Sequence, residues 1–250
     1  MTELAEVSRR CKLAALDMVY KASRGHLGTS FSSMDIIVAM RSLMGPGDTF
    51  ISSKGHDAPA VYAVLAEYGI LERERLDTLR KLGGLPGHPT VDVPGIVCNT
   101  GSLGMGLSKA CGFVEAWRLR GLRHRAFVLL GDGEMSEGQN YEAILYAARR
   151  EMGELCAAVD CNGWGQDGPA MDAGGIASMF RAAGWMVRFV WGDADDLAES
   201  FVDSGIMPIA WMVQTRKGQG VSFMMEHPEV WHQRAPNAEE YARARKELSE

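Results

Sequence analysis

Short apolar segments alternate with helix-like segments along the second half of the chain. Four segments have the length and apolar character of strands: 126–130, 155–160, 185–191 and 208–214. Three segments with helical spacing separate them: 141–150, 176–183 and 193–203. Continuous apolar strands that alternate with helices are typical of a parallel sheet that helices cover on both faces. The pattern predicts an α/β fold with a doubly wound parallel sheet flanked by helices.

The first half of the chain predicts one more strand and several helices. Residues 4–22 have helical spacing, and Ser32 with Asp35 resembles a capping box before the apolar run 36–40. A strand at 49–53 and helices at 58–68, 72–82 and 105–120 complete the set. Because neither a repeat nor a linker interrupts the pattern, we expect a single domain over residues 1–250.

Composition and charge exclude several classes of protein. The chain has 250 residues, of which 46% are hydrophobic, so a disordered chain is excluded. Its formal net charge of −6 argues against a nucleic-acid partner, which would need a basic surface. No apolar stretch reaches the roughly 18–20 residues of a membrane span, so we expect no membrane partner.

The cysteines and the N-terminus indicate the compartment. The five cysteines are odd in number and form no CxxC pair, which is typical of reduced thiols. The first ten residues carry Glu3 and Glu6 and lack the apolar centre of a secretory signal. We therefore expect a cytoplasmic protein.

Glycine is over-represented, with 29 positions in 250, and many of these flank polar residues after predicted strands. Gly131-Asp132-Gly133 directly follows one strand, and Asn162 follows the next. The carboxyl ends of neighbouring parallel strands meet at one edge of the sheet, where ligands bind. A carboxylate and an amide oxygen there would suit Mg²⁺ with phosphate oxygens, although an isolated Gly-Asp-Gly is more often a simple turn.

Seven ordered motifs together resemble the transketolase family, specifically its N-terminal domain, which binds the diphosphate of thiamine diphosphate (ThDP). The matching stretches run from about Leu13 to Glu240. They are Arg24-Gly25-His26-Leu27-Gly28, Ser53-Lys54-Gly55-His56, Gly87-His88-Pro89, the segment 101–106, the segment 131–138, the segment 162–168 and Lys217-Gly218-Gln219-Gly220. The resemblance implies a ThDP-binding fold and a ThDP-dependent enzyme that needs Mg²⁺, or Ca²⁺ or Mn²⁺ in its place.

The resemblance also implies a set of cofactor-binding residues. The metal ligands would be the side chains of Asp132 and Asn162 and the main-chain carbonyl of Trp164. The other residues implied to contact the cofactor are His56, Gly101, Leu103, Gly104, Gly131, Gly133, Glu134, Gln166 and His232. Among these, Gly133 and Glu134 would offer backbone N–H groups to the diphosphate, and Leu103 and Gly104 would lie against the rings.

Three histidines are implied to act on the substrate. His26, His88 and His232 would bind sugar hydroxyls or move protons, a task suited to a near-neutral pKa. Glu137 matches an acidic residue that joins a carboxylate network across the family's dimer. A glutamate that favours a helix N-terminus is the alternative reading of that position.

The family resemblance accounts for one half of an active site. In transketolases, the glutamate that activates the ThDP pyrimidine lies on a second, pyrimidine-binding domain, and no second α/β pattern follows residue 214 here. We therefore expect a partner chain, a C-terminal transketolase subunit, in an α2β2 assembly. Together they would transfer a two-carbon ketol unit from a ketose phosphate to an aldose phosphate.

Two other functions remain open from the sequence. One is a subunit of another ThDP enzyme, either 1-deoxyxylulose-5-phosphate synthase-like or acting on 2-oxo acids. The other is a non-catalytic regulatory or binding subunit that has kept the fold. Four histidines match active-site histidines of the family: His26, His56, His88 and His232. They favour transketolase, because hydroxylated sugars need hydrogen-bonding groups.

Overall fold

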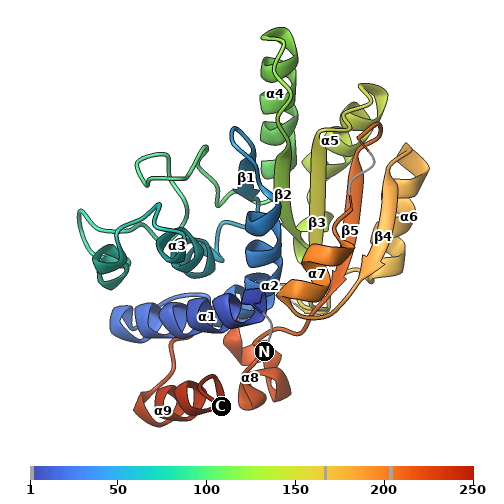
Figure 1. The fold of residues 1–250 in the computed structure, drawn as a ribbon. Helices are drawn as coiled ribbons and strands as arrows, with labels where there is room; N and C mark the ends of the chain where they lie inside the picture. Colours follow the sequence, from blue (N-terminus) through green and yellow to red (C-terminus); the bar gives the residue numbers. More distant parts are fainter. Residues whose placement is uncertain (1–2, 166–167, 203–204) are drawn as a thin grey trace.

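One parallel sheet forms the centre of the computed structural model, which describes residues 3–165, 168–202 and 205–250 (Figure 1). Its strands, in spatial order, are β1 (Thr49–Ser52), β2 (Ala126–Gly131), β3 (Leu155–Cys161), β5 (Ile209–Gln214) and β4 (Met186–Val190). All neighbouring pairs in this order are parallel. The expected parallel α/β sheet is confirmed.

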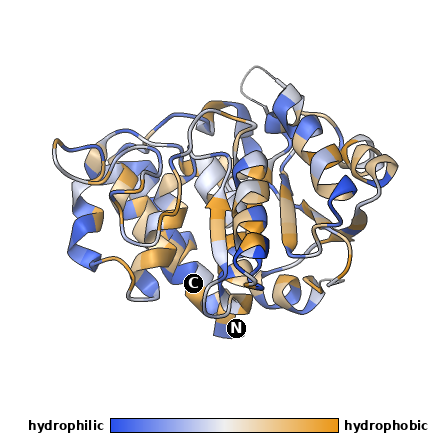
Figure 2. Ribbon diagram, turned by 90° about the horizontal axis from the view of Figure 1, so that it is seen from above, coloured by the Kyte–Doolittle hydropathy of each residue, from blue (hydrophilic) through white to orange (hydrophobic). Residues whose placement is uncertain are grey.

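Helices cover both faces of the sheet, because successive residues of the central strands point to opposite sides. Phe127 and Leu129 of β2 belong to one buried core, and Val128 and Leu130 belong to the other. The first core is built with α1 (Glu3–Ala22), α2 (Leu27–Leu43), α3 (Ala58–Glu67) and α7 (Ala194–Ser200). The second core is built with α4 (Gly106–Leu119), α5 (Gly138–Arg149) and α6 (Ala173–Ala183). In Figure 2 the strands are coloured mostly hydrophobic, whereas the helices carry both colours.

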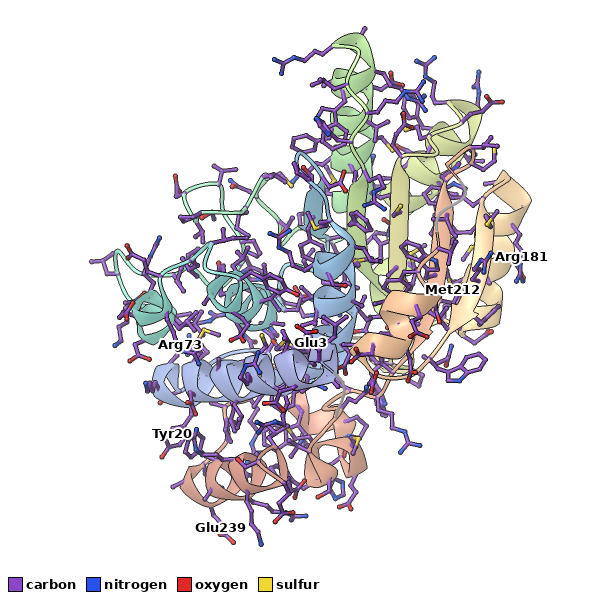
Figure 3. The ribbon with its side chains drawn as sticks, in the orientation of Figure 1. Glu3, Tyr20, Arg73, Arg181, Met212 and Glu239 are labelled. Atoms are coloured by element: carbon purple, nitrogen blue, oxygen red, sulfur yellow. The ribbon has the colours of Figure 1, made fainter. Side chains whose placement is uncertain are left out.

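The C-terminal segment returns beneath α1. It comprises α8 (Ser222–Glu226), a 3₁₀ helix (Pro228–Trp231) and α9 (Ala238–Glu247). Asn237 and Glu240 form a capping box at the start of α9. Tyr20 of α1 stacks on Tyr241 of α9 with ring centroids 4.1 Å apart, and Tyr20 lies on the side of α1 that faces α9 (Figure 3). This return places His232 close to the carboxyl edge of the sheet.

The predicted capping box at Ser32 and Asp35 is wrong. Both residues lie inside α2, which begins at Leu27. The Ser32 hydroxyl donates to Asp160 at 2.7 Å, and Asp35 accepts from Lys12 at 2.8 Å. Residues 27–40 of α2 are all buried, so this helix has no solvent-facing side and no amphipathic pattern to mark its start.

The predicted helix at 72–82 is shorter than expected. It is a 3₁₀ helix (Arg73–Thr78), after which Arg80 adopts a left-handed backbone conformation with φ of 58°. From residue 79 to residue 105 the described chain has neither helix nor strand, and from Gly83 on this stretch is rich in glycine and proline. This long loop carries His88 and the ring-binding segment implied by the family.

Two general expectations can also be compared with the structure. Within the described residues, the helices are too short or too polar to cross a lipid bilayer. All five cysteines are free thiols, and each is buried except Cys98, which is partly exposed.

Candidate active site

A cavity of about 580 Å³ lies where β1, β2 and β3 end, at the carboxyl edge of the sheet. Loops that are far apart in sequence meet there. The predicted site residues that line it are His26, His56, His88, Gly101, Leu103, Gly131, Asp132, Gly133, Glu134, Glu137, Asn162, Trp164 and His232. Parallel strands bring these loops together because their carboxyl ends share one edge.

One predicted residue, Gly104, does not line the cavity. Gly104 is buried behind it, with its amide donating to the Glu134 carboxylate at 2.7 Å. Gln166 lies outside the described residues.

The structure adds residues that sequence reasoning missed. Thr29 and Lys54 line the cavity, and both lie within or next to motifs that carry the family resemblance. Lys217 is buried nearby, where burial lowers the pKa of its ammonium and the charges of Asp132 and Asp160 act against that shift. A lysine in a polar loop after a strand was the available signal for Lys54 and Lys217.

Asp132 and Asn162 lie at the ends of adjacent strands. Gly131 pairs with Asp160 in the β2–β3 ladder, so the two side chains follow at nearly the same level. The Asp132 carboxylate accepts from Gly133 N at 2.8 Å and from Gly163 N at 2.6 Å. These bonds use two of roughly four lone-pair positions and leave the others for a cation.

Asn162 is held in a defined orientation. Its Nδ2 donates to Asp160 Oδ2 at 3.1 Å, and its Oδ1 accepts from Trp164 N at 3.1 Å. Partners of this kind fix the direction of a metal ligand. The amide oxygen therefore lies on the same side as the Trp164 backbone.

The donor set fits a hard divalent cation with phosphate oxygens. Burial, followed by the charge of Asp160, raises the pKa of Asp132 to about 6. The negative charge of the Asp132 carboxylate is therefore unfavourable here, and a bound cation would stabilise it. Among the described residues, no cluster of three or more His, Cys, Asp or Glu side chains could hold a metal alone. One carboxylate, one amide and one carbonyl leave the remaining positions to a ligand such as a diphosphate.

The loops leave room for close backbone approach. A Cβ placed on Gly133 would lie 2.8 Å from Gly165 Cα, so no other residue fits there without movement of the backbone. The loop after β2 and the loop after β3 are thus in direct contact. Backbone groups rather than side chains form this part of the cavity wall.

A buried ion pair supports the loop that carries Asn162. Lys54 Nζ lies 2.6 Å from Asp160 Oδ2, and both side chains are almost completely buried. Burial alone would lower the pKa of Lys54, but Asp160 and Asp57 attract its proton and raise that pKa overall. Asp160 also accepts from the Ser32 and Thr215 hydroxyls. Its carboxylate therefore connects β3 with α2 and with the residues that follow β1 and β5.

Four histidines form a cluster on one wall of the cavity. The His26 ring centroid lies 5.3 Å from that of His56, 5.3 Å from that of His232 and 6.3 Å from that of His88. They come from the start of α2, the loop after β1, the long loop and the C-terminal segment. The structure thus brings together the four histidines that the resemblance groups as active-site residues.

The expectation of near-neutral histidine pKa values does not hold for this cluster. Burial, followed by the neighbouring charges of His232 and Arg80, lowers the pKa of His26 to about 3. Burial also lowers the pKa values of His56 and His88. These three rings are therefore neutral at pH 7, and each offers one N–H donor and one acceptor nitrogen.

Two buried polar atoms point to a polar ligand. His26 Nδ1 and Thr29 Oγ1 are buried and have no hydrogen-bond partner among the described residues. Both residues line the cavity. Because buried polar groups are nearly always hydrogen-bonded, a ligand with hydroxyl groups would satisfy them.

Replacing His26 with Asn should make the stability of the cofactor-free chain less dependent on pH below 6.5. Between the folded pKa of about 3 and the ordinary value near 6.5, the unfolded chain binds more protons at this residue. The wild type therefore loses up to about 1.4 kcal/mol of unfolding free energy per pH unit as pH falls through this range. Urea denaturation at pH 6.5, 5.5 and 4.5 should show that the unfolding free energy decreases more steeply with falling pH in the wild type than in the variant.

The exposed residue His227 provides the matched control for this test, since its side chain is 68% exposed. The curve of His227→Asn should follow that of the wild type at all three pH values. Parallel curves for His26→Asn and the wild type would contradict the depressed pKa.

Glu137 lies at the edge of the cavity and is exposed. It occupies the N-cap position of α5, but its side chain makes no capping hydrogen bond. This position at the N-terminus of α5 is the one that the alternative reading, a glutamate that favours the helix dipole, requires. An acidic group here is accessible to another chain.

Comparison with known proteins identifies the family to which this architecture corresponds. Residues 4–206 match the family described as transketolase, thiamine diphosphate binding domain. The chain is 35% identical to a subunit of the apulose-4-phosphate transketolase of Phocaeicola vulgatus, over 99% of this chain and 94% of that relative. It is 33% identical to the transketolase of Homo sapiens over 92% of this chain, but spans only 39% of that relative.

A solved structure shows the same fold. The transketolase of Campylobacter jejuni superposes with a TM-score of 0.88 over 100% of this chain and 43% of that chain, at 24% identity. At this identity the likeness concerns the fold alone.

Proposed function

The chain belongs to the transketolase family and carries its thiamine diphosphate binding domain, and on this basis we propose that it is the ThDP-binding subunit of a transketolase. The observation that carries the proposal is one cavity in which the pair Asp132 and Asn162 lies beside the histidine cluster. The Phocaeicola vulgatus relative, which this chain covers almost completely, is itself named as one subunit of a transketolase. The chain therefore acts as a transferase subunit, with a two-carbon ketol unit as the transferred group.

The loops after β2 and β3 hold the cofactor. Asp132, Asn162 and the Trp164 carbonyl bind a divalent cation, Mg²⁺ or Ca²⁺ or Mn²⁺ in its place. Gly133 and Glu134 would offer backbone N–H groups to the diphosphate, and Gly131 and His56 would lie beside it. Gly101, Leu103 and Gly104 would lie toward the rings, and the family resemblance also assigns Gln166 to cofactor binding. ThDP, when bound, supplies the electron sink for breaking a carbon–carbon bond.

The histidine cluster orients the sugar and moves protons. The neutral ring of His26 and the hydroxyl of Thr29, both with unsatisfied polar atoms, bind substrate hydroxyls. A ring nitrogen of His88 or His232 accepts a proton from a hydroxyl and returns it, as a general base and acid. The buried position of His26 excludes water from that side of the substrate.

The second half of the site comes from a partner chain. That chain is a C-terminal transketolase subunit, with the pyrimidine-binding domain and its activating glutamate, while residues 1–250 act as one diphosphate-binding domain. Two copies of each form an α2β2 assembly, and the exposed Glu137 joins a carboxylate network between copies. The substrates are sugar phosphates, and the five free cysteines favour a cytoplasmic location.

The other functions considered from sequence are not favoured. The relatives from Phocaeicola vulgatus and Homo sapiens are named as transketolases or their subunits, rather than as 1-deoxyxylulose-5-phosphate synthases or enzymes of 2-oxo acids. A regulatory subunit without catalysis would have no need of the histidine cluster and the metal-ligand pair together.

Reconstitution tests the proposed function. The purified chain with ThDP and Mg²⁺ should show no ketol transfer, whereas adding a chain with the pyrimidine-binding domain should restore transfer from a ketose phosphate to an aldose phosphate. Coupled detection of the released aldose measures the reaction, and pyruvate as donor is the control. Transfer by the chain alone would overturn the requirement for a second chain, and preferential use of pyruvate would overturn the reaction.

A further inference from the structure

The Glu134 side chain joins three separate loops around the cavity. Its carboxylate accepts from the Ser53 hydroxyl, from Gly104 N at 2.7 Å and from Gly131 N at 3.1 Å. Glu134 is only 3% exposed. A buried carboxylate that accepts several donors is held firmly, because leaving any of these buried groups unpaired is costly.

The three donors belong to three different loops beside the cavity. Ser53 follows β1, Gly131 ends β2, and Gly104 lies in the loop that leads into α4. The Ser53 hydroxyl oxygen also accepts from Gly106 N at 3.0 Å, so the first residue of α4 is tied to the same point. Gly104 and Gly131 are therefore held by the two oxygens of a single side chain.

The backbone around Gly104 has little freedom of its own to replace this contact. Gly104 has a left-handed φ of 80°, and a Cβ at this position would lie 2.6 Å from Glu137 Cβ. The preceding part of the long loop has neither helix nor strand. A side-chain acceptor is thus needed to fix the position of the Gly104 amide.

From this arrangement we infer that Glu134 is a positioning residue, whose carboxylate fixes the loop 101–106 relative to the loop 131–134. The inference extends the proposed function: the first loop lies toward the cofactor rings and the second toward its diphosphate. Holding both loops at a fixed separation prepares the cavity before the cofactor binds. The Glu134 side chain acts through its hydrogen bonds to the backbone amides of these two loops.

Glu134→Gln tests this role with little change in size. A glutamine can accept the Gly104 amide through its oxygen, but its NH₂ group then faces Gly131 N–H, where two donors oppose each other. The KM for ThDP in the reconstituted enzyme should rise about 10- to 100-fold, with kcat at saturating ThDP changed less than about threefold. A residue needed only for overall stability would not give this separation of KM from kcat.

Hydrogen exchange of the cofactor-free chain provides a measurement that does not depend on activity. In Glu134→Gln the amides of Gly104 and Gly131 should exchange at least about tenfold faster, while those of Ala157 and Ala158 in β3 should not change. Ser53→Ala, which removes one donor, should shift exchange at Gly104 in the same direction by a smaller factor. If Glu134→Gln does not fold, this second variant carries the test.

Glu154→Gln is the matched control, since Glu154 pairs with Arg118 next to the opposite end of β3. It should leave both the KM for ThDP and exchange at Gly104 unchanged. Unchanged exchange at Gly104 in Glu134→Gln and Ser53→Ala, or equal acceleration of all core amides, would overturn the inference. Absence of ketol transfer in the wild-type pair would overturn the proposed function alone, because the exchange measurement needs neither cofactor nor partner.

Discussion

Asp132→Ala should abolish metal-dependent binding of ThDP and lower ketol transfer by the reconstituted enzyme at least about 100-fold. Loss of a residue that merely supports a metal ligand costs about 10- to 100-fold, so loss of a ligand itself should reach or exceed the upper value. The carboxylate is the only acidic side chain in the proposed donor set. Calorimetric titration with ThDP, with and without Mg²⁺, measures the binding directly.

Asp92→Ala is the control for this experiment, because Asp92 is an exposed carboxylate on the long loop that does not line the cavity. It should bind ThDP as the wild type does. Circular dichroism of cofactor-free Asp132→Ala should show a folded chain. The change removes a buried carboxylate, and with it the free-energy cost of taking that carboxylate out of water. Equal metal-dependent binding by Asp132→Ala and Asp92→Ala would rule out the assigned metal site.

Lys54→Met should lower the unfolding free energy of the cofactor-free chain by about 3–5 kcal/mol, the usual cost of removing one partner of a buried ion pair. The change leaves the Asp160 carboxylate buried without its ammonium partner, 2.6 Å away in the wild type. The double variant Lys54→Met with Asp160→Asn should recover part of this loss, because no uncompensated carboxylate remains there. Urea denaturation of the single and double variants gives the comparison.

The surface pair Lys21–Asp77 offers a control with the same distance and a different environment. Its atoms are also 2.6 Å apart, but the side chains are 51% and 59% exposed. Lys21→Met should therefore cost no more than about 1 kcal/mol. Similar losses of unfolding free energy in Lys54→Met and Lys21→Met would show that burial does not determine how much the Lys54–Asp160 pair contributes to stability.

The architecture could be predicted because the central strands are buried on both faces. Runs such as Ala126–Gly131 contain almost nothing polar, and such a run can be recognised without knowing which strands lie beside it. The start of α2 could not be predicted in the same way. Ser32 and Asp35 resemble a helix start in sequence, but their partners, Asp160 and Lys12, lie 128 and 23 positions away.

In the candidate site, too, some residues could be predicted from the local sequence and others could not. Motif residues such as Asp132 and Asn162 could be placed because they directly follow strands whose order the fold dictates. The Lys54–Asp160 pair and the Glu134 hydrogen bonds depend on packing between loops, which no local pattern encodes. The lowered pKa of His26 likewise arises from burial in the folded cluster, so the histidine content alone suggested the wrong value.

The position of His232 has a consequence for biosynthesis. His232 lies on the cavity wall, 100 positions after Asp132, and only 18 residues follow it in the chain. At a translation rate of about 5–20 residues per second, this wall emerges about 5–20 s after the metal-ligand loop. A nascent chain therefore exposes the loop that carries Asp132 before the side of the cavity formed by His232 is complete.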